Sequence, residues 1–189
     1  FVKGDITDKN LIDNLIQKQD IVIHAAALAD VGACVRNPEI EFQTNIVSTQ
    51  GILEASKKNN IEKFIFISSA AVYGMGNRGI FKETDPCFPV SNYALSKYWG
   101  EQQTKLYYDL YDLPTTSIRF FSVYGSFGRP DMFIHKYLNA IKKNKKVYLY
   151  NNGLNFRDFT YVDDLVKILI LSLKLVRTKF NSFCPDLFS

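Results

Sequence analysis

The sequence is poor in cysteine and has no long apolar run. Its three cysteines, Cys34, Cys87 and Cys184, stand far apart, and no C-x-x-C pair occurs. An odd number of isolated cysteines argues against a disulfide framework or a zinc site. We therefore expect no metal centre and a protein of the reducing cytoplasm. The most apolar stretch, residues 165–176, is interrupted by two lysines and is too short to cross a bilayer about 30 Å thick, so no membrane partner is expected.

A leader segment and a strong net charge are also missing. The chain opens Phe1-Val2-Lys3-Gly4-Asp5, without a basic segment followed by an apolar one, so no signal peptide is expected. The formal net charge is +4 over 189 residues. This modest charge suits an anionic small-molecule ligand and falls short of the pattern typical of nucleic-acid binding. With 47% hydrophobic residues, the chain can form one core and part of a second.

What the sequence does contain is a regular alternation of strand-like and helix-like segments. The expected strands are the end of a first strand at 1–2, then 20–25, 63–68 and 115–121. The expected helices are 8–18, 38–58 and 91–112. Near-continuous apolar strands alternating with amphipathic helices predict a parallel sheet covered by helices on both faces. The predicted fold class is therefore α/β, a Rossmann-like doubly wound parallel sheet.

After residue 121 this rhythm changes. Glycines and a proline between 125 and 130 predict a loop, followed by a helix at 131–144 and a short strand at 147–150. Residues 160–163 resemble a capping box that leads into a helix ending near Lys174. We expect residues 1–122 to form a dinucleotide-binding domain and residues 123–189 to form part of a small substrate-binding region.

A glycine-rich turn is missing where a doubly wound fold needs one. Such folds bind the dinucleotide on a turn after the first strand, with an acidic residue about 20 positions later, and neither feature precedes Asp5. A G-x-G-x-x-G does occur at residues 74–79, but Pro86 and Pro89 follow it in place of a helix. We interpret it as a loop near the active site. We expect the chain to be N-terminally truncated, without its first β-α-β unit.

Tyr93 and Lys97 stand four residues apart at the start of a predicted helix, so they lie one turn apart on the same face. A phenol is a poor base at neutral pH because its pKa is about 10. A neighbouring ammonium lowers that pKa, and a bound nicotinamide cation would lower it further. The pair therefore predicts a general base for a substrate hydroxyl. The alternative is a plain helix that buries the tyrosine while the lysine reaches solvent.

Further motifs follow the predicted strands. They are Gly4-Asp5-Ile6, His24-Ala25-Ala26-Ala27, Ser68-Ser69-Ala70-Ala71-Val72-Tyr73-Gly74 and Arg119-Phe120-Phe121-Ser122-Val123-Tyr124-Gly125. Ligands of open α/β sheets bind at the carboxyl ends of the strands, so these motifs indicate one binding region. Asn45 lies inside the helix predicted at 38–58, although asparagine has an unfavourable helix propensity. An unfavourable polar residue at such a position indicates a functional role.

Two longer motifs, 128–132 (Gly-Arg-Pro-Asp-Met) and 156–164 (Phe-Arg-Asp-Phe-Thr-Tyr-Val-Asp-Asp), are more specific. Together with Pro89-Val90-Ser91 before Tyr93, the set resembles the extended short-chain dehydrogenase/reductase family, in its NAD-dependent epimerase/dehydratase branch. Within that branch it is most similar to UDP-glucuronate 4-epimerases. The resemblance implies NAD as cofactor, a nucleotide sugar as substrate and a homodimer.

The resemblance also implies a role for individual residues. The catalytic residues would be Ser69, Tyr93 and Lys97. The NAD-binding residues would be Asp5, Ile6, Ala25, Ala26, Ala27, Asn45, Ser68, Tyr93, Lys97 and Phe120. The substrate-binding residues would be Ser69, Ser122, Arg129 and Arg157, with the two arginines at the anionic end of the substrate.

The homodimer would form through helices 38–58 and 91–112, which carry apolar residues beyond one face. Those residues are Ile46, Ile52, Leu53, Trp99, Leu106 and Tyr107. The alternative is that all of them face the sheet.

Structural roles remain open for several of the site residues. Asp5 could be a helix-entry residue beside Thr7, and Ser69 could bond the backbone at a strand end. Arg157 could form a surface pair with Asp158 worth under about 1 kcal/mol.

The residues after Ser69 narrow the reaction. Sugar 4,6-dehydratases have an acidic pair there, whereas Ala70 and Ala71 cannot transfer protons. The resemblance therefore implies a 4-epimerase acting on a UDP-sugar such as UDP-glucuronate or UDP-glucose, by transient oxidation at C4. The alternatives are a UDP-sugar decarboxylase, reductase or dehydratase, a non-catalytic dinucleotide-binding scaffold, and an inactive fragment.

Overall fold

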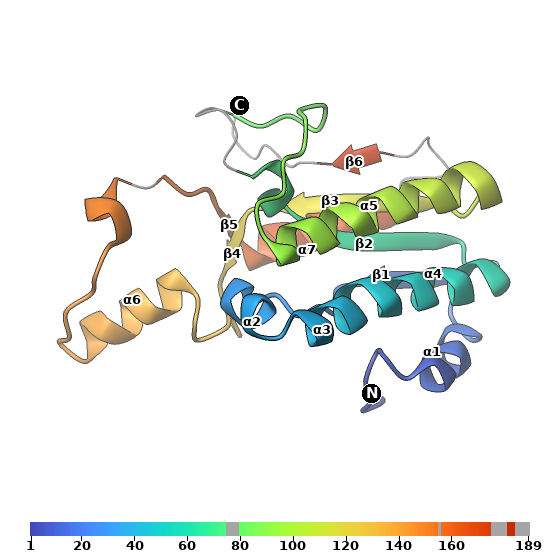
Figure 1. Ribbon diagram of the computed structural model, residues 1–189, viewed down its shortest axis with the longest axis horizontal. Coiled ribbons are helices and arrows are strands. Elements are labelled where there is room, and N and C mark those ends of the chain that lie inside the picture. The colour runs from blue at the N-terminus through green and yellow to red at the C-terminus, as the bar shows by residue number, and fades with distance from the viewer. Residues whose placement is uncertain (75–79, 155, 175–180, 184–189) are drawn as a thin grey trace. The chain divides into compact units, whose positions relative to one another are not determined.

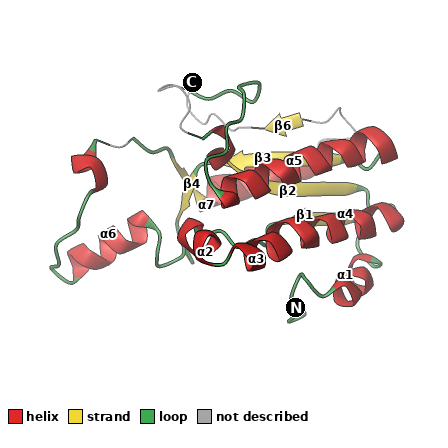
Figure 2. Cartoon of the chain, viewed as in Figure 1, coloured by secondary structure: helices red, strands yellow, loops and turns green. Residues whose placement is uncertain are grey.

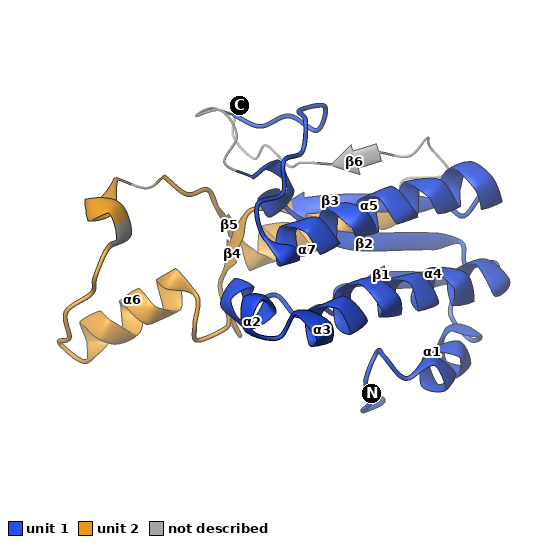
Figure 3. Ribbon diagram, viewed as in Figure 1, with its two compact units in different colours: residues 1–119, 175–189 blue, residues 120–174 orange. Residues whose placement is uncertain are grey.

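The computed structural model describes residues 1–74, 80–154, 156–174 and 181–183. The chain divides into two compact units, one formed by residues 1–119 with 175–189 and the other by residues 120–174 (Figure 3). The glycine-rich stretch at 75–79, for which a loop was predicted, lies outside the described residues.

A four-stranded sheet forms the centre of the first unit, in the order β1-β2-β3-β6 (Figure 1). Its strands are β1 (Ile21–His24), β2 (Lys63–Ser69), β3 (Thr115–Phe120) and β6 (Asn181–Phe183). β1 pairs with β2 in parallel, with Ile21 opposite Lys63, and β3 pairs in parallel with β6. The predicted α/β fold with a parallel sheet is confirmed.

Helices precede and connect these strands (Figure 2). They are α1 (Lys9–Ile16), α2 (Val31–Arg36), α3 (Pro38–Glu41), α4 (Ser48–Lys58), α5 (Asn92–Tyr111) and the short 3₁₀ helix η2 (Ala70–Tyr73). In Figure 1, α4 and α5 lie side by side over the sheet, and α5 packs on β2. The helix predicted at 91–112 is confirmed to within one residue at each end.

The helix predicted at 38–58 is present but not uniform. Between α3 and α4 the backbone forms a π-helical segment, η1 (Phe42–Val47). π-Helical turns are rare and often occur at functional sites. Here the segment contains Asn45, one of the residues assigned to the cofactor site from the sequence. α2, which precedes this helix, was not predicted.

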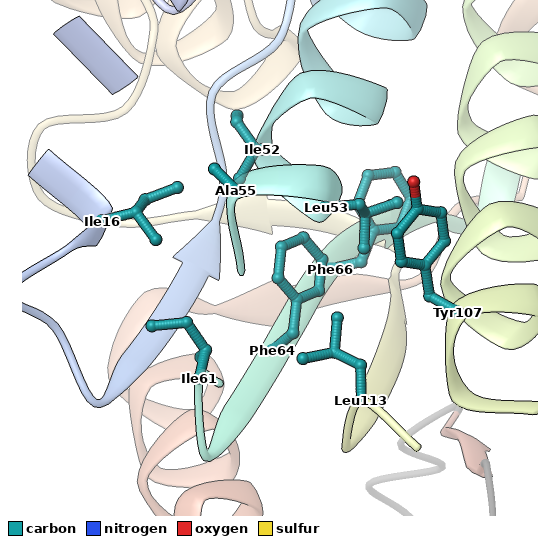
Figure 4. Packing of buried hydrophobic residues seen from close by; sticks show 9 residues of the cluster. All are labelled: Ile16, Ile52, Leu53, Ala55, Ile61, Phe64, Phe66, Tyr107 and Leu113. Carbon is teal, nitrogen blue, oxygen red and sulfur yellow. The ribbon is translucent and has the colours of Figure 1, made fainter. Parts of the chain in front are cut away.

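The main apolar core lies between β2 and the helices (Figure 4). Its nine buried members are Ile16, Ile52, Leu53, Ala55, Ile61, Phe64, Phe66, Tyr107 and Leu113. α5 approaches β2 closely at Gly100, where a Cβ atom would lie 2.3 Å from the Cζ atom of Phe66. A glycine is therefore required at that position for this packing.

A serine and a left-handed residue bound α5. The Ser91 Oγ accepts a hydrogen bond from the Ala94 amide at 3.1 Å, which satisfies a free amide of the first turn. At the other end Asp112 adopts a φ of 53°, a conformation in which helices commonly stop. These caps fix the position of the first turn of α5, where Tyr93 lies.

The second unit contains a parallel two-stranded sheet of β4 (Ser122–Tyr124) and β5 (Phe159–Tyr161). Its helices are α6 (Phe133–Lys142), α7 (Val162–Lys174) and the 3₁₀ helix η3 (Tyr150–Gly153). β4 and β5 were not predicted. The strand predicted at 147–150 is wrong, because residues 147–149 are irregular and Tyr150 begins η3. The strand end predicted at 1–2 is wrong as well, since both residues are irregular and exposed.

Among the helices that the structure describes, none is both long and apolar enough to cross a membrane. Within the same residues no group of three or more His, Cys, Asp or Glu side chains is placed to hold a metal ion.

Candidate active site

The candidate base and its lysine lie together in the first two turns of α5. Tyr93 is half-buried, and Lys97 is buried with 4% of its surface exposed. The Lys97 Nζ donates a hydrogen bond of 2.8 Å to the carbonyl of Ile67, near the carboxyl end of β2. It lies 6.0 Å from the centroid of the Tyr93 ring and 5.0 Å from that of Phe66. The one-turn relation that the spacing predicts is therefore present, with the ammonium held close to the tyrosine ring.

Burial changes the proton affinity of two groups at this site. It lowers the pKa of Lys97 to about 8. His24, the last residue of β1, has a pKa lowered to about 3, first by burial and then by the charge of Lys97. The His24 imidazole is therefore neutral. Its Nε2 lies 2.8 Å from the Thr49 Oγ1, and this hydroxyl donates its proton to the Asn45 carbonyl at 2.7 Å. Nε2 is consequently the protonated nitrogen of His24.

Asn45 connects three segments around Lys97. Its Oδ1 accepts from the Leu28 amide at 2.8 Å, and its Nδ2 donates to the Leu28 carbonyl at 3.1 Å. The same Nδ2 lies 2.9 Å from the Glu41 Oε1 and 3.2 Å from the Ser96 Oγ. The Asn45 amide therefore joins the segment after β1 to the turn of α5 beside Lys97. Its predicted role in NAD binding would act through these segments.

The two serines that end β2 make different bonds. The Ser69 Oγ accepts from the Ala71 amide at 3.2 Å and caps η2, the backbone bond weighed above as the structural alternative. This bond uses a lone pair, so the hydroxyl keeps its proton for another partner. Ser68 is buried, and its hydroxyl donates to the Glu101 Oε1. The Ser68 side chain, which was predicted to bind the cofactor, is thus hydrogen-bonded to Glu101 in the protein interior.

A buried ion pair that the sequence analysis missed lies next to these serines. Arg119 of β3 and Glu101 of α5 are joined by two hydrogen bonds, from Nε to Oε1 at 2.9 Å and from Nη2 to Oε2 at 2.7 Å. They are 5% and 1% exposed. A sequence signal for this pair did exist, because a charged residue inside an apolar strand such as 115–121 is rarely buried without a partner.

Asp5 and Ile6, which were predicted to bind NAD, are not among the buried residues of the core. Asp5 is exposed, and its Oδ1 accepts from the Thr7 amide at 2.9 Å and the Thr7 hydroxyl at 2.8 Å. These bonds lower the pKa of Asp5, the amide contributing most. This is the geometry of the helix-entry alternative. Ile6 is half-buried against the core.

Small side chains follow β1 at its carboxyl end. Ala25 and Ala26 are exposed, and Ala27 is half-buried. Small side chains at the end of a strand allow a ligand to approach the backbone closely, which fits part of a dinucleotide site. Among the described residues, no segment that follows a strand and opens a helix is a glycine-rich phosphate turn.

Three of the four residues predicted to bind substrate, Ser122, Arg129 and Arg157, lie in the second unit, whereas Ser69 lies in the first. The Ser122 amide donates to the Asp158 carbonyl at 3.1 Å, and Phe120 is buried where β3 ends. The Arg129 guanidinium binds the Asp131 carboxylate through two hydrogen bonds, from Nε to Oδ1 at 3.0 Å and from Nη2 to Oδ2 at 2.6 Å. The Arg157 Nη1 donates to the Phe156 carbonyl at 2.9 Å, and its side chain is exposed.

This parallel sheet, with a Tyr-x-x-x-Lys pair at a helix start beside a strand-end serine, defines a Rossmann-like protein of the short-chain dehydrogenase/reductase type. Residues 1–182 match the NAD dependent epimerase/dehydratase family, and the chain belongs to that family. NAD is the cofactor of its members.

Individual relatives support this placement. A UDP-glucuronate 4-epimerase of Thermodesulfobacterium geofontis is 34% identical over 176 residues, covering 92% of this chain and 54% of that protein. A UDP-N-acetylglucosamine 4-epimerase from Methanobrevibacter ruminantium M1, solved with UDP-N-acetylmuramic acid, has a TM-score of 0.93 at 32% identity, covering 100% of this chain and 61% of that one. A UDP-glucuronic acid 4-epimerase from Bacillus cereus, solved with UDP-glucuronic acid and NAD, has a TM-score of 0.88 at 32% identity, covering 95% and 56%. The chain spans about half the length of the curated relatives it matches.

Proposed function

We propose that the full-length protein is an NAD-dependent nucleotide-sugar 4-epimerase of the cytoplasm, acting on a UDP-sugar such as UDP-glucuronate or UDP-glucose. The observation that carries the proposal is the buried Lys97 ammonium beside the Tyr93 ring, one turn into α5 and next to the end of β2. This is the arrangement that turns a phenol into a usable base.

The reaction divides between cofactor and protein. NAD, when bound, supplies the acceptor and later the donor of a hydride. Tyr93 takes the proton of the sugar 4-hydroxyl as C4 loses its hydride and becomes a ketone. Ser69 donates a hydrogen bond to the same oxygen. After the 4-keto sugar has turned in the site, Tyr93 would return the proton to the same oxygen and C4 would be inverted, so the net reaction would involve no oxidation.

Two features bear on the choice among related reactions. Ala70 and Ala71 follow Ser69 in η2 and carry no group that can transfer a proton. A 4,6-dehydratase needs an acid and a base to eliminate water across C5 and C6, so these alanines favour epimerisation. Solved relatives with this fold bind UDP-glucuronic acid and UDP-N-acetylmuramic acid, which supports a UDP-sugar as substrate.

We assign cofactor binding to residues 1–122 and substrate binding to residues 123–189. Arg129 and Arg157 of the second region, together with Ser122 at the end of the first, are the proposed contacts for the nucleotide diphosphate and the acidic end of the sugar. A guanidinium can bind phosphate or carboxylate oxygens as a fork, and Arg129 already binds the Asp131 carboxylate in this way.

We also propose a homodimer through the helices α3–α4 and α5. The contact residues named from the sequence need correction, because Ile52, Leu53 and Tyr107 are buried in the subunit's own core (Figure 4). Leu106, also named from the sequence, is exposed. Leu95, Leu110 and Tyr111 are further exposed apolar residues of α5.

The test is a product assay on the full-length protein with UDP-glucuronate, UDP-glucose and UDP-N-acetylglucosamine. We expect one of them to give its C4 epimer without net change in NADH.

Tyr93→Phe should lower kcat by about 10²–10⁴-fold while NAD binding is kept, because only the proton acceptor is lost. Tyr108→Phe, on the same helix, is the matched control. A 4-keto-6-deoxy product or released CO₂ would place the protein in another branch of the family.

A further inference from the structure

The ion pair of Glu101 and Arg119 joins the helix of the candidate base to two strands of the sheet. Glu101 lies one turn beyond Lys97 on the same face of α5, and Arg119 lies on β3. Both side chains are almost fully buried, with 1% and 5% of their surface exposed. A buried pair often adds no more stability than apolar residues of the same size. Its presence therefore calls for a role other than stability.

The first part of that role is to fix the register of α5 along β2. The Lys97 Nζ binds the carbonyl of Ile67, and the Glu101 carboxylate accepts from the hydroxyl of Ser68. Two consecutive residues of the strand are thus held by two consecutive turns of the helix. Ser69 is the next residue of β2, and Tyr93 begins the preceding turn of α5. These two contacts therefore fix where Tyr93 stands along the strand end that carries Ser69.

The second part concerns the segment after Ser69. The remaining guanidinium nitrogen of Arg119, Nη1, donates to the Tyr73 hydroxyl at 2.9 Å and to the Glu83 carbonyl at 3.3 Å. The Tyr73 hydroxyl donates in turn to the Lys82 carbonyl at 3.0 Å. The Tyr73 ring is 1% exposed and stacks on Phe81 with centroids 4.6 Å apart.

Ser69 is therefore anchored from both sides. Ser68, before it, is bonded to Glu101, and η2, which begins directly after it, ends at the tyrosine bonded to Arg119. The contacts come from α5, β2, β3 and residues 81–83, which are distant in sequence. A change in the ion pair would move the Ser69 hydroxyl relative to the Tyr93 phenol, although neither ion touches the reacting atoms.

We propose that Glu101 and Arg119 are positioning residues, which set the Ser69 hydroxyl against the Tyr93 phenol for proton transfer at C4. This inference rests on the proposed 4-epimerase function. A displacement of about 1 Å in a catalytic group can cost about 10²-fold in rate, so the effect belongs in kcat.

A double substitution separates positioning from stability in the full-length protein. Glu101→Gln alone would leave Arg119 buried without a counter-charge and would destabilise the fold. Glu101→Gln with Arg119→Met removes both charges and keeps the volume. We expect the double variant to recover the melting temperature of the wild type, with kcat lower by roughly tenfold or more and with KM and NAD affinity little changed. Recovery of kcat together with melting temperature would overturn the positioning role.

Tyr73→Phe keeps both charges and the stacked ring, so it tests the inference even if the double variant does not fold. It removes the hydroxyl that links Arg119 to the Lys82 carbonyl, and we expect kcat to fall severalfold at unchanged KM. The control is Asp109→Asn, which breaks an exposed pair with Lys105 on the same helix and should leave kcat unchanged. Wild-type kcat in Tyr73→Phe contradicts the inference alone. A wild-type protein that epimerises no UDP-sugar contradicts the proposed function as well.

Discussion

At Lys97, burial opposes the charged state of the amine that the proposed reaction needs. Its amine must be charged to lower the pKa of Tyr93, yet burial lowers its own pKa to about 8 from the usual 10.5. Between these two pH values the unfolded chain holds a proton that the folded chain has released. The contribution of Lys97 to the free energy of unfolding is therefore lowest below pH 8 and rises as the pH increases towards 10.5.

Lys97→Met should remove this pH dependence. At pH 7 we expect the variant to be more stable than the wild type by on the order of 2 kcal/mol, after the loss of the bond to the Ile67 carbonyl, because one pKa unit corresponds to about 1.4 kcal/mol. The difference should shrink between pH 8 and pH 10.5. Urea unfolding of both proteins at pH 7, 9 and 10 measures it. A difference that stays constant with pH would show that burial does not shift the Lys97 pKa.

At the scale of residues, the sequence predicts contacts within one element and misses those between elements. Tyr93 and Lys97 meet because a helix brings residues four apart together, whatever the rest of the fold does. Glu101 and Arg119 lie 18 positions apart on a helix and a strand. Their pairing depends on how α5 crosses the sheet, which no local pattern encodes. The same holds for Ser68, whose partner could not be named before the register of α5 was known.

At the scale of elements, one glycine of α5 decides how closely this helix packs on β2. A Cβ atom at Gly100 would lie 2.3 Å from a buried Phe66 ring, whereas one at Gly51 in α4 would meet nothing within 4 Å. Alanine favours a helix interior over glycine by roughly 0.5–1 kcal/mol.

The same substitution should therefore have opposite effects in the two helices. We expect Gly51→Ala to stabilise the protein by about 0.5–1 kcal/mol and Gly100→Ala to destabilise it by about 1–3 kcal/mol, because a packed core resists added volume. Thermal or urea unfolding of the two variants beside the wild type measures both. If Gly100→Ala proved neutral, α5 would have to lie farther from β2 than the structure places it.

The long helices and the apolar strands β2 and β3 were predicted well. β1 was found as a strand, but Ile21 and Ile23 are exposed and only His24 is buried. Most short elements were not predicted. The helix of residues 92–111 has 20 residues over which its pattern repeats, so its ends were found to within one residue. β4 and β5 have three residues each, too few to show a period, and they exist because they pair with each other. The apolar run at 147–150 shows the reverse case, a predicted strand that does not form. In the part of the chain that the structure describes, it pairs with no strand and ends in η3.

At the scale of the whole molecule, an exposed apolar stripe remains on α5. Leu95, Leu106 and Leu110 are 55%, 43% and 61% exposed. They lie on one face of α5, because residues 11 and 4 apart are separated by whole turns. The opposite face, with Lys97, Glu101 and Thr104, is buried.

We expect Leu106→Glu in the full-length protein to convert the proposed homodimer into a monomer. A buried, unpaired carboxylate at the centre of a helix–helix contact costs several kcal/mol, and two-fold symmetry would place it there twice. Sedimentation at micromolar concentration measures the mass of each form.

The control is Val35→Glu, which adds the same charge at a residue of another helix, α2, that is 65% exposed. It should leave the mass unchanged. If the wild type sediments as a monomer, no dimer forms through these helices. If both variants stay dimeric, the subunits associate through another surface, and the leucine stripe requires a different partner. Only loss of the dimer in Leu106→Glu alone assigns the contact to α5, since an effect of charge in general would appear in both variants.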